Sequence, residues 1–436
     1  MRTATTSRWC AMSQLLRRLV ALEPGEAPAL LGSFATLFLT FASYTILRPV
    51  RDALGVTSGL ENVPYLFWGV FAVMLLLQPV YGWLTTRHPR EVFLPWTYGF
   101  FAANLIGFWL WFRLSADHVW IARTYFVWVS VFALFVVATF WSLMADVFTR
   151  EQAGRLFGFI WAGASTGGLV GPLIARKLAV PLGAINLLPL SAGLLLLAVV
   201  VMARVIAWHR ARGGTASAGT GRDVLPAAGG GTFAAFAQVA RSPYLLGIVL
   251  FVLLMTWVST FLYLEQLAFV AKAYHTTDER TRFNAGVDLW VQGASLFMQF
   301  LLFGRLFRWF GMRALLAAVP VLMVLVYAIF ANFPLFWVAV VAYAVRRAAD
   351  YSITRPCRDA LFTVVSREEK YQAKSLIDTF AYRGGDAVSG SLYKALSSAG
   401  GTLLVGWAGA LIAVAWAGVA LALGRGYQAR SRARGA

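Results

Sequence analysis

Residues 242–271 read SPYLLGIVLFVLLMTWVSTFLYLEQLAFVA, and Glu265 is the only charged residue among them. A helix of about 20 apolar residues is long enough to cross the hydrocarbon core of a bilayer. In lipid every backbone N–H and C=O must be bonded within the protein, which leaves helices or closed barrels, and a barrel strand needs only about 10 residues. The stretch therefore predicts a membrane-spanning α-helix.

The composition of the whole chain agrees with this reading. Its 436 residues are 59% hydrophobic and 13% charged, which is too apolar for an ordinary soluble globule. The net charge of +19 would suggest nucleic acid in a soluble protein, but the basic residues lie between apolar runs and at both ends of the chain. In those places they set membrane topology. We expect the partners to be the lipid bilayer and a small molecule, with no nucleic acid.

Apolar runs of spanning length recur along the chain. Most of the Lys and Arg residues lie in the even-numbered loops and the two tails, which indicates that both termini are cytoplasmic, in a bacterial inner membrane. The Gly- and Ser-rich stretch 208–241 divides the runs six and six and is typical of a flexible linker. The runs lie at about 27–50, 64–85, 93–114, 119–146, 154–180, 183–207, 242–271, 284–307, 310–330, 332–354, 372–398 and 401–424. The predicted domains are a cytoplasmic segment with an interfacial helix at 1–26, bundles at 27–207 and 242–424, the linker at 208–241 and a basic cytoplasmic tail at 425–436.

A weak internal repeat connects the two halves. FTREQAGR at 148–155 corresponds to VSREEKYQAK at 365–374, and both strings lie in loops expected to be cytoplasmic. Two six-span halves related by a parallel repeat form the architecture of the major facilitators. We therefore predict an all-α polytopic membrane protein with about twelve transmembrane helices in two six-helix bundles.

A stronger repeat joins span 1 to span 10. YTILRPVRDAL at 44–54 reappears as YSITRPCRDAL at 351–361, with eight of eleven positions identical. The predicted topology places the two copies at opposite membrane faces. Inverted repeats within each half make these places equivalent on cavity-lining helices. The two copies are therefore candidates for a pair of gates.

The charges of this motif support a gating hypothesis. Arg48 and Asp52 are one helical turn apart, and Arg355 and Asp359 repeat the spacing. Each Arg could pair with its Asp or bind an anionic substrate, because guanidinium donors match phosphate oxygens bidentately. The other interpretation is that the charges reach the interface from span ends. The proline after each leading arginine predicts a broken or kinked helix, and a helix end would have the same sequence.

At these residues the sequence resembles the ATP/ADP antiporter family of intracellular bacteria and plastids, also called nucleotide exchange transporters, which is related to the major facilitators. Residues 44–54 are similar to the family's YxxLRxxKD string, residues 264–286 to its LvE…K…Y…F-M-G segment, and residues 374–385 to its KaaID…R-x-G segment. The chain departs at Arg51, where the family usually has lysine, and at Asp386, where a basic residue commonly stands. The resemblance implies alternating access for an anionic solute, such as nucleotide exchange.

The motif copies and the resemblance together predict a site. We expect Asp52→Asn to favour the outward-open state and Asp359→Asn the inward-open state. The charges around Arg347, in the lower half of span 10, indicate a water-filled vestibule. The residues expected to bind substrate are Arg48, Arg51, Glu265, Arg347, Arg355 and Arg358, with Lys374 and Arg383 implied by the resemblance, and the residues expected to gate are Tyr44, Asp52, Tyr351 and Asp359.

Glu265 has several open interpretations. It lies in an apolar stretch with no basic neighbour three or four residues away. It could pair with a charge on another helix, bind a substrate hydroxyl or base edge, carry a proton, or touch water at the periplasmic end of its span. Asp288, Arg123, Arg383 and Lys394 are expected to form ion pairs between helices rather than to contact substrate.

Other functions are disfavoured by what the chain lacks. It has no HExxH and no phosphate-binding glycine loop, so we expect no enzyme and no cofactor. Two separated cysteines, Cys10 and Cys357, indicate neither a disulfide framework nor a metal site. The alternative function is a proton-coupled exporter of drugs or metabolites, for which a single carboxylate such as Glu265 would matter without the arginines. A non-transporting scaffold would tolerate the loss of every intramembrane charge. We expect a monomer.

Overall fold

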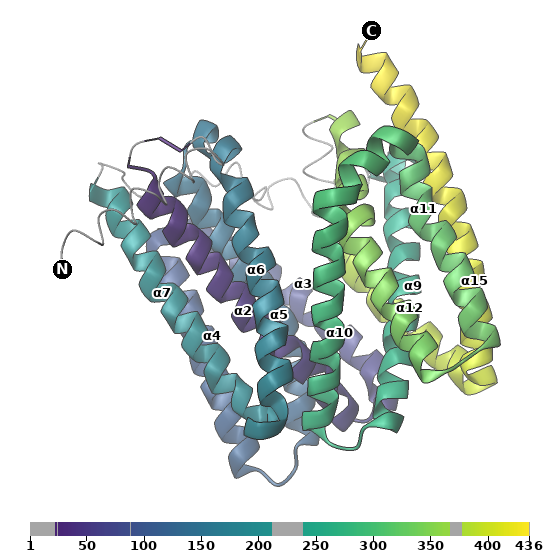
Figure 1. The fold of residues 1–436 in the computed structure, drawn as a ribbon, viewed down its shortest axis with the longest axis horizontal. Coiled ribbons are helices and arrows are strands. Elements are labelled where there is room, and N and C mark those ends of the chain that lie inside the picture. Colours follow the sequence, from purple (N-terminus) through teal and green to yellow (C-terminus); the bar gives the residue numbers. More distant parts are fainter. Residues whose placement is uncertain (1–21, 24, 88, 212–238, 367–376, 436) are drawn as a thin grey trace. The chain divides into compact units, whose positions relative to one another are not determined.

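The computed structural model describes residues 22–23, 25–87, 89–211, 239–366 and 377–435 (Figure 1). All regular structure within these residues is helical. The first half contains α2 (Ala27–Thr57), α3 (Val63–Arg87), α4 (Arg90–Leu114), α5 (Val119–Val147), α6 (Arg150–Leu182) and α7 (Leu187–Ala211), with the short 3₁₀ turns η1 (Leu60–Asn62) and η2 (Ala184–Asn186). The second half contains α9 (Pro243–Ala273), α10 (Thr277–Phe297), η3 (Met298–Phe303), α11 (Gly304–Asn332), α12 (Phe336–Ala349), η4 (Asp350–Thr354), α13 (Arg355–Leu361), η5 (Phe362–Val364), η6 (Ile377–Gly384) and α15 (Gly385–Gly435).

Each of the twelve apolar runs predicted from the sequence corresponds to a helical segment within the described residues. Eight helices are long and apolar enough to cross a membrane by length and composition, and two of these are double-length stretches, Thr277–Asn332 and Phe380–Ala433. Each double stretch bends at a glycine with positive φ, Gly311 at 70° and Gly401 at 61°, a conformation that a side chain would strain. The eight candidate stretches therefore contain ten segments of spanning length, and α4 and the α12–α13 segment coincide with the other two predicted runs.

Capping residues fix where several helices begin. Thr149 and Gln152 form a capping box at the start of α6, and Thr276 and Glu279 form one at the start of α10. In each box the threonine side chain accepts a backbone N–H that the first helical turn leaves unpaired. Two helix starts after loops are therefore encoded locally in the sequence.

The chain forms two compact units, which we describe separately. Unit 1 comprises Met1–Arg48, Trp83–Ala116 and Phe132–Thr220, and unit 2 comprises Pro49–Gly82, Asp117–Val131 and Gly221–Ala436. The boundaries between the units fall inside α2, α3 and α5. The domain boundaries expected from the sequence remain predictions.

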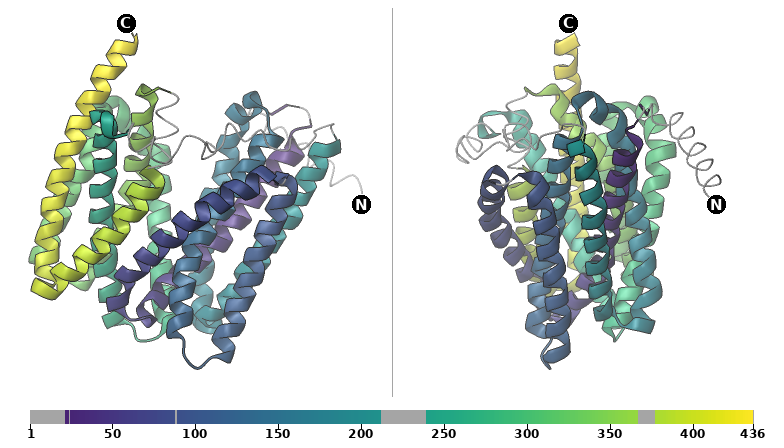
Figure 2. Two further views of the ribbon diagram at one scale, coloured as in Figure 1. Left: turned by 180° about the vertical axis from the view of Figure 1, so that it is seen from behind. Right: turned by 90° about the vertical axis from the view of Figure 1, so that its left-hand side faces the viewer.

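Unit 1 is held together by close helix contacts. Helices α4 and α7 lie side by side (Figures 1 and 2). Helix α6 approaches α2 so closely that a Cβ atom on Gly163 would lie 2.5 Å from the Phe34 carbonyl oxygen. One turn further on, the Thr45 hydroxyl lies 3.2 Å from the Gly167 carbonyl oxygen. Small residues at helical spacing allow this approach, which matters in lipid because helix association there depends on packing and hydrogen bonds.

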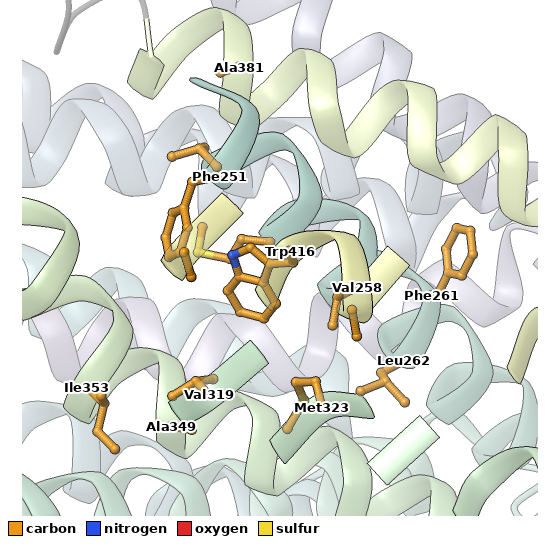
Figure 3. Close-up of a cluster of buried hydrophobic side chains, with 14 of the residues drawn as sticks. Phe251, Val258, Phe261, Leu262, Val319, Met323, Ala349, Ile353, Ala381 and Trp416 are labelled. Carbon is orange, nitrogen blue, oxygen red and sulfur yellow. The ribbon is translucent and has the colours of Figure 1, made fainter. Parts of the chain in front are cut away.

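The apolar interior of unit 2 lies among α9, α11 and α15, where α15 packs against both of the other helices (Figure 2). Trp416 of α15 is 2% exposed, and its ring centroid lies 5.5 Å from that of Phe251 of α9. Val319 and Met323 of α11 complete the cluster around it (Figure 3). These apolar side chains hold α9, α11 and α15 together.

Three π-helical segments, η3, η4 and η6, occur in unit 2. In η4 the Arg355 N–H bonds the Asp350 carbonyl, five residues back. The next π-helical donor, to the Tyr351 carbonyl, would be Pro356, which lacks an N–H. This carbonyl accepts a 2.8 Å hydrogen bond from the Gln299 side chain in η3. The proline of the second motif copy is thus accommodated by helix widening and a bond to a neighbouring helix.

The first motif copy behaves differently from the expectation of a break or a helix end. Pro49 lies inside α2, which continues to Thr57, past the predicted end of the span near residue 50. A continuous helix is feasible because a proline removes one hydrogen bond and the following turns can still form.

Some predictions fall outside the described residues. These are most of the segment 1–26, the linker between 212 and 238, and the loop that contains Lys374. Helix α7 extends to Ala211, into the stretch expected to be linker, and α15 extends through the expected basic tail to Gly435.

Candidate functional site

A buried carboxylate connects the C-terminal part of α2 to α9. Arg51 donates to Asp52 Oδ1 from Nε at 3.0 Å and from Nη2 at 2.7 Å, and the Tyr263 hydroxyl donates to the same oxygen at 2.9 Å. The Arg51 guanidinium also lies 5.0 Å from the centroid of the Phe126 ring. Asp52 is 4% exposed, so these donors replace the water that would otherwise stabilise its charge.

A second buried pair connects α10 to α12. Arg347 is 2% exposed and donates to Asp288, and it also donates to the Tyr343 hydroxyl at 3.2 Å. The expectation that Asp288 forms an ion pair between helices is confirmed. The rings of Tyr343 and Tyr263 have centroids 6.1 Å apart, so this pair and the Asp52 contact are neighbours in one polar region. Arg347, predicted to bind substrate, has its charge balanced by Asp288 in this structure.

The second motif copy pairs differently from the spacing-based prediction. Arg355 Nε donates to Asp350 Oδ2 at 3.2 Å, and its guanidinium lies 4.4 Å from the Tyr351 ring centroid. Asp359, expected to pair with Arg355, instead accepts from Arg358 at 3.4 Å and has a 52% exposed side chain. The reason is the π-helical turn, which brings side chains five residues apart onto one face. In the first copy too, the aspartate pairs with its chain neighbour, since Arg51 forms an ion pair with Asp52.

The two motif copies contact α9 at positions far apart. Asp52 is bonded to Tyr263, whereas the Leu361 carbonyl accepts a 3.0 Å hydrogen bond from Tyr244 near the start of α9. At 1.5 Å per residue these two tyrosines are about 28 Å apart along the helix. This distance is close to the thickness of the hydrocarbon core. Within unit 2 the copies therefore have the separation expected of sites near opposite membrane faces.

Three arginines surround the carboxylate of Asp386, at the start of α15. The Thr260 hydroxyl donates to it at 3.2 Å, and Arg383 Nη1 lies 3.9 Å from its other oxygen. Arg346 and Arg51 also interact with it electrostatically. This carboxylate stands where the resembled family commonly has a basic residue, and here it offsets part of a strongly positive region.

Arg346 differs from the other arginines of this region. It is 8% exposed, and its Nε has no hydrogen-bond partner. Arg346 forms no ion pair with any residue that the structure describes. A buried guanidinium of this kind favours the binding of an anion.

Glu265 lies in a neutral environment. It is 3% exposed, and the Thr402 hydroxyl donates to its Oε2 at 3.4 Å. Tyr393 also interacts with the carboxyl group. Among the residues that the structure describes, Glu265 has no ion pair, and the nearest basic side chain acting on it is Lys272, an exposed residue on the same helix. Of the open interpretations, a charge partner on another helix is therefore not found.

The remaining predicted site residues belong to different units. Arg48 and Tyr44 are half-buried on α2, and the Tyr44 ring centroid lies 6.4 Å from that of Phe132 in unit 1. Arg383 is half-buried beside Asp386. Lys374 cannot be placed with the others because it lies outside the described residues.

A separate polar cluster joins the starts of α2 and α6 in unit 1. Arg155 bonds both Glu23, at 2.9 Å, and Glu26, at 3.2 Å, and the Gln152 amide donates to Glu26 at 2.8 Å. Burial by itself raises the pKa of the Glu26 carboxyl, but the Glu23 N–H, Gln152 and Arg155 outweigh it and hold the pKa below its usual value. The first copy of the loop repeat, which contains Gln152 and Arg155, thus meets the start of α2.

Several residues of the polar region were not among the predicted site residues. They are Tyr263, Thr260, Asp288, Tyr343, Arg346, Asp350 and Asp386. The sequence did signal three of them, because Asp288, Arg346 and Asp350 are charges inside apolar spans. The tyrosines and Thr260 carried no such signal, since these residue types are common on packed membrane helices.

Comparison with known proteins defines the class of fold. No protein-family model matches the chain. A solved bacterial homologue of the iron transporter ferroportin, in an inward-facing state, superimposes with a TM-score of 0.64 at 14% identity, covering 92% of this chain and 98% of that one. A bacterial homologue of the human lysosomal transporter Spinster, also inward-facing, gives 0.57 at 14% identity over 94% and 99%. The nucleoside transporter NupG gives 0.56 at 12% identity over 92% and 99%.

One curated protein is similar in sequence. The "ADP,ATP carrier protein 2" of Chlamydia pneumoniae is 24% identical over 35% of this chain and 34% of its own length. The chain thus spans about a third of that relative in the match. The fold is that of an all-α polytopic membrane protein with major-facilitator-like architecture, as the sequence predicted. The proteins it is similar to are transporters or carriers rather than enzymes, in agreement with the expectation that this chain is not an enzyme.

Proposed function

We propose that this protein is a secondary transporter that moves an anionic solute by alternating access, with nucleotide exchange as the leading candidate. The similar folds of three transporters and the partial similarity to an ADP,ATP carrier support the transporter class. We also propose that it lies in a bacterial inner membrane with both termini in the cytoplasm, as the distribution of basic residues indicates. A monomer suffices for this mechanism.

The observation that carries the substrate class is the charge of the polar region in unit 2. Four of its arginines each form an ion pair with an aspartate, whereas Arg346 forms none in the described part of the chain and acts only electrostatically on Asp386, which is already the partner of Arg383. The four pairs are Arg51–Asp52, Arg347–Asp288, Arg355–Asp350 and Arg383–Asp386. An intramembrane arginine without a carboxylate partner is costly unless an anion neutralises it. A phosphate or carboxylate group bound beside Arg346 would do so, and its guanidinium presents donors in matching geometry.

A transport assay with a panel of anions tests this proposal directly. Purified protein in proteoliposomes should exchange an internal for an external anion, with ADP, ATP, inorganic phosphate, a sugar phosphate and a dicarboxylate as probes. We expect exchange of at least one of these anions. A neutral nucleoside and a cationic dye serve as controls, and we expect neither of them to be exchanged. Movement of the neutral or cationic controls without any of the anions would overturn the anionic assignment and favour the drug or metabolite exporter.

The two motif copies fit the role of gates in different states. Asp52 is bonded to a tyrosine on α9, so it connects a helix of the first half of the chain to one of the second half. Asp359 accepts from its chain neighbour Arg358 and has a half-exposed side chain. In alternating access one gate is closed while the other is open. The bond between Asp52 and Tyr263 therefore supports a state closed at Asp52.

Asp52→Asn should open the Asp52 gate more often. Asparagine can still accept the Tyr263 hydroxyl, but a neutral amide oxygen binds it less strongly than a carboxylate does, so about 1.4 kcal/mol of lost stabilisation would open the gate about tenfold more often. A reporter cysteine at Phe67, a half-buried residue packed on Tyr263, should then react faster with a membrane-impermeant maleimide. The background chain would lack Cys10 and Cys357.

Asp359→Asn is the matched control, because it alters the equivalent carboxylate of the second copy. It should leave labelling at Phe67 unchanged or slow it. Equal labelling rates in wild type and in both variants would mean that the motif is structural and that the gating hypothesis is wrong.

A further inference from the structure

We propose that the Glu265 carboxyl group is a proton-binding site through which transport is coupled to proton movement. The inference rests on the proposed transporter function and adds the coupling ion to it. In this scheme the carboxylate takes up one proton from the aqueous side to which it is open and releases it to the other. No other bond is made or broken.

The surroundings of Glu265 supply hydroxyl groups and no cation. On α15, Thr402 donates to the carboxylate at 3.4 Å and Tyr393 interacts with it. On α11, Tyr327 is within electrostatic range and donates its hydroxyl to the Val258 carbonyl at 2.6 Å. On α9 itself, Lys272 is two turns away and exposed. The described elements packed around the carboxyl group therefore present neutral partners, apart from this distant lysine.

A buried carboxyl group with such partners is stable in its neutral form. Transfer of an unpaired carboxylate from water to an apolar interior is costly, and protonation removes most of that cost. Asp288 and Asp52 show the contrast, because each has an arginine beside it that stabilises the charge. Asp288 and Asp52 thus have an arginine that stabilises their charge, whereas the charge of Glu265 depends on solvent access.

The chemistry of the site favours a proton over a metal cation. A hard cation such as Mg²⁺ or Ca²⁺ takes six or more oxygen ligands. Glu265 supplies one carboxylate, and Thr402 and Tyr393 supply hydroxyls. In the residues that the structure places, no group of three His, Cys, Asp or Glu side chains is close enough to hold a metal. One carboxyl with hydroxyl neighbours is sufficient for a proton.

The position of Thr402 gives protonation a route to conformational change. Thr402 directly follows Gly400 and Gly401, where α15 bends and the second of its two segments begins. The hydrogen bond to Glu265 therefore connects the carboxyl group to the first residue after this bend. A charged carboxylate holds the threonine hydroxyl more strongly than a neutral acid does. Proton uptake should loosen the contact at the point where the two segments of α15 meet.

The transport test compares wild type with Glu265→Gln, which mimics the protonated side chain. The probe is ADP, replaced by inorganic phosphate if ADP is not exchanged. In wild type, an imposed pH gradient should increase net accumulation of the probe. In Glu265→Gln, the ratio of probe accumulation with the gradient to accumulation without it should fall to one, whatever the exchange rate of the variant, because its side chain has no proton to take up or release. An imposed sodium gradient serves as the control for another coupling ion.

Glu151→Gln is the matched control variant, since Glu151 is an exposed glutamate at the start of α6. It should keep both exchange and the response to the gradient. A wild-type protein that exchanges the probe but ignores the pH gradient would refute proton coupling and leave the proposed function intact. Retention of the gradient response by Glu265→Gln would refute the assignment to this residue.

A second measurement needs no substrate. Infrared difference spectra of the purified full chain, recorded across a pH titration, should contain a carbonyl band of a buried protonated carboxyl group. The band should be missing in Glu265→Gln and present in Glu151→Gln. An identical band in wild type and Glu265→Gln would overturn the inference even if no anion in the panel is transported.

Discussion

Arg346→Gln should weaken binding of the transported anion more than any other single neutralisation of an arginine in the polar region. Loss of one charged hydrogen bond corresponds to about 1.5–3 kcal/mol, or about a 10- to 150-fold increase in the dissociation constant. The other arginines of the region already share their charge with an aspartate, and Arg346 has no such partner in the described chain. Equilibrium binding of radiolabelled ADP, or of the best anion in the panel, measures the effect.

Two further variants separate charge from geometry and from general damage. Arg346→Lys keeps the charge but loses the planar fork of donors, so its affinity should lie between those of wild type and Arg346→Gln. Arg308→Gln removes an exposed arginine of α11 and should bind like wild type. If Arg346→Gln binds the anion as tightly as Arg308→Gln does, the anion site lies elsewhere.

Asp288→Asn should destabilise the fold strongly. The substitution leaves the guanidinium of Arg347, which is 2% exposed, without its carboxylate partner. Breaking a buried pair from one side typically costs about 3–5 kcal/mol, because the remaining charge is left uncompensated. Loss of tryptophan fluorescence during thermal unfolding in detergent would show this as a lower midpoint temperature.

The double variant Asp288→Asn with Arg347→Gln provides the decisive comparison. With both charges removed, much of the lost stability should return, because neither side chain is then a buried unpaired ion. Arg358→Gln is the control, since its partner Asp359 is half-exposed and such pairs contribute about 0–1 kcal/mol. A double variant less stable than Asp288→Asn alone would show that Arg347 stabilises the unit through other contacts.

The fold was predictable because its main determinant, the length of the apolar runs, can be read directly from the sequence. Apolar runs of spanning length require helices in lipid, and no partner residue has to be known for that conclusion. The bends were harder to locate, since Gly311 and Gly401 are two of 39 glycines and only their backbone angles distinguish them. The π-helical turns were not predicted at all, because they depend on bonds such as that between Gln299 and Tyr351 across two helices.

The site was predictable in its residue types and less so in its pairings. The repeat motif and the charges within apolar spans pointed to Arg51, Asp52 and Arg347, which lie in one polar region of unit 2, and their roles in binding and gating stay predictions. Their partners could not be read from spacing, because the partner of Arg347 is Asp288, on another helix 59 residues away. Within the motif, spacing suggested Arg355 with Asp359, and the local helix geometry selected Asp350 instead.

The duplicated string at 44–54 and 351–361 adopts two backbone forms in one molecule. Its first copy is α-helical throughout, while the second begins in a π-helical turn and becomes α-helical only at Arg355. Eight of eleven residues are the same, so the amino-acid sequence by itself does not dictate which form is taken. The choice must come from the surroundings, such as the side-chain amide offered to the Tyr351 carbonyl. The motif is thus a stretch of chain that is compatible with either helical pitch, and the wider turn of its second copy is stabilised by a bond from a neighbouring helix.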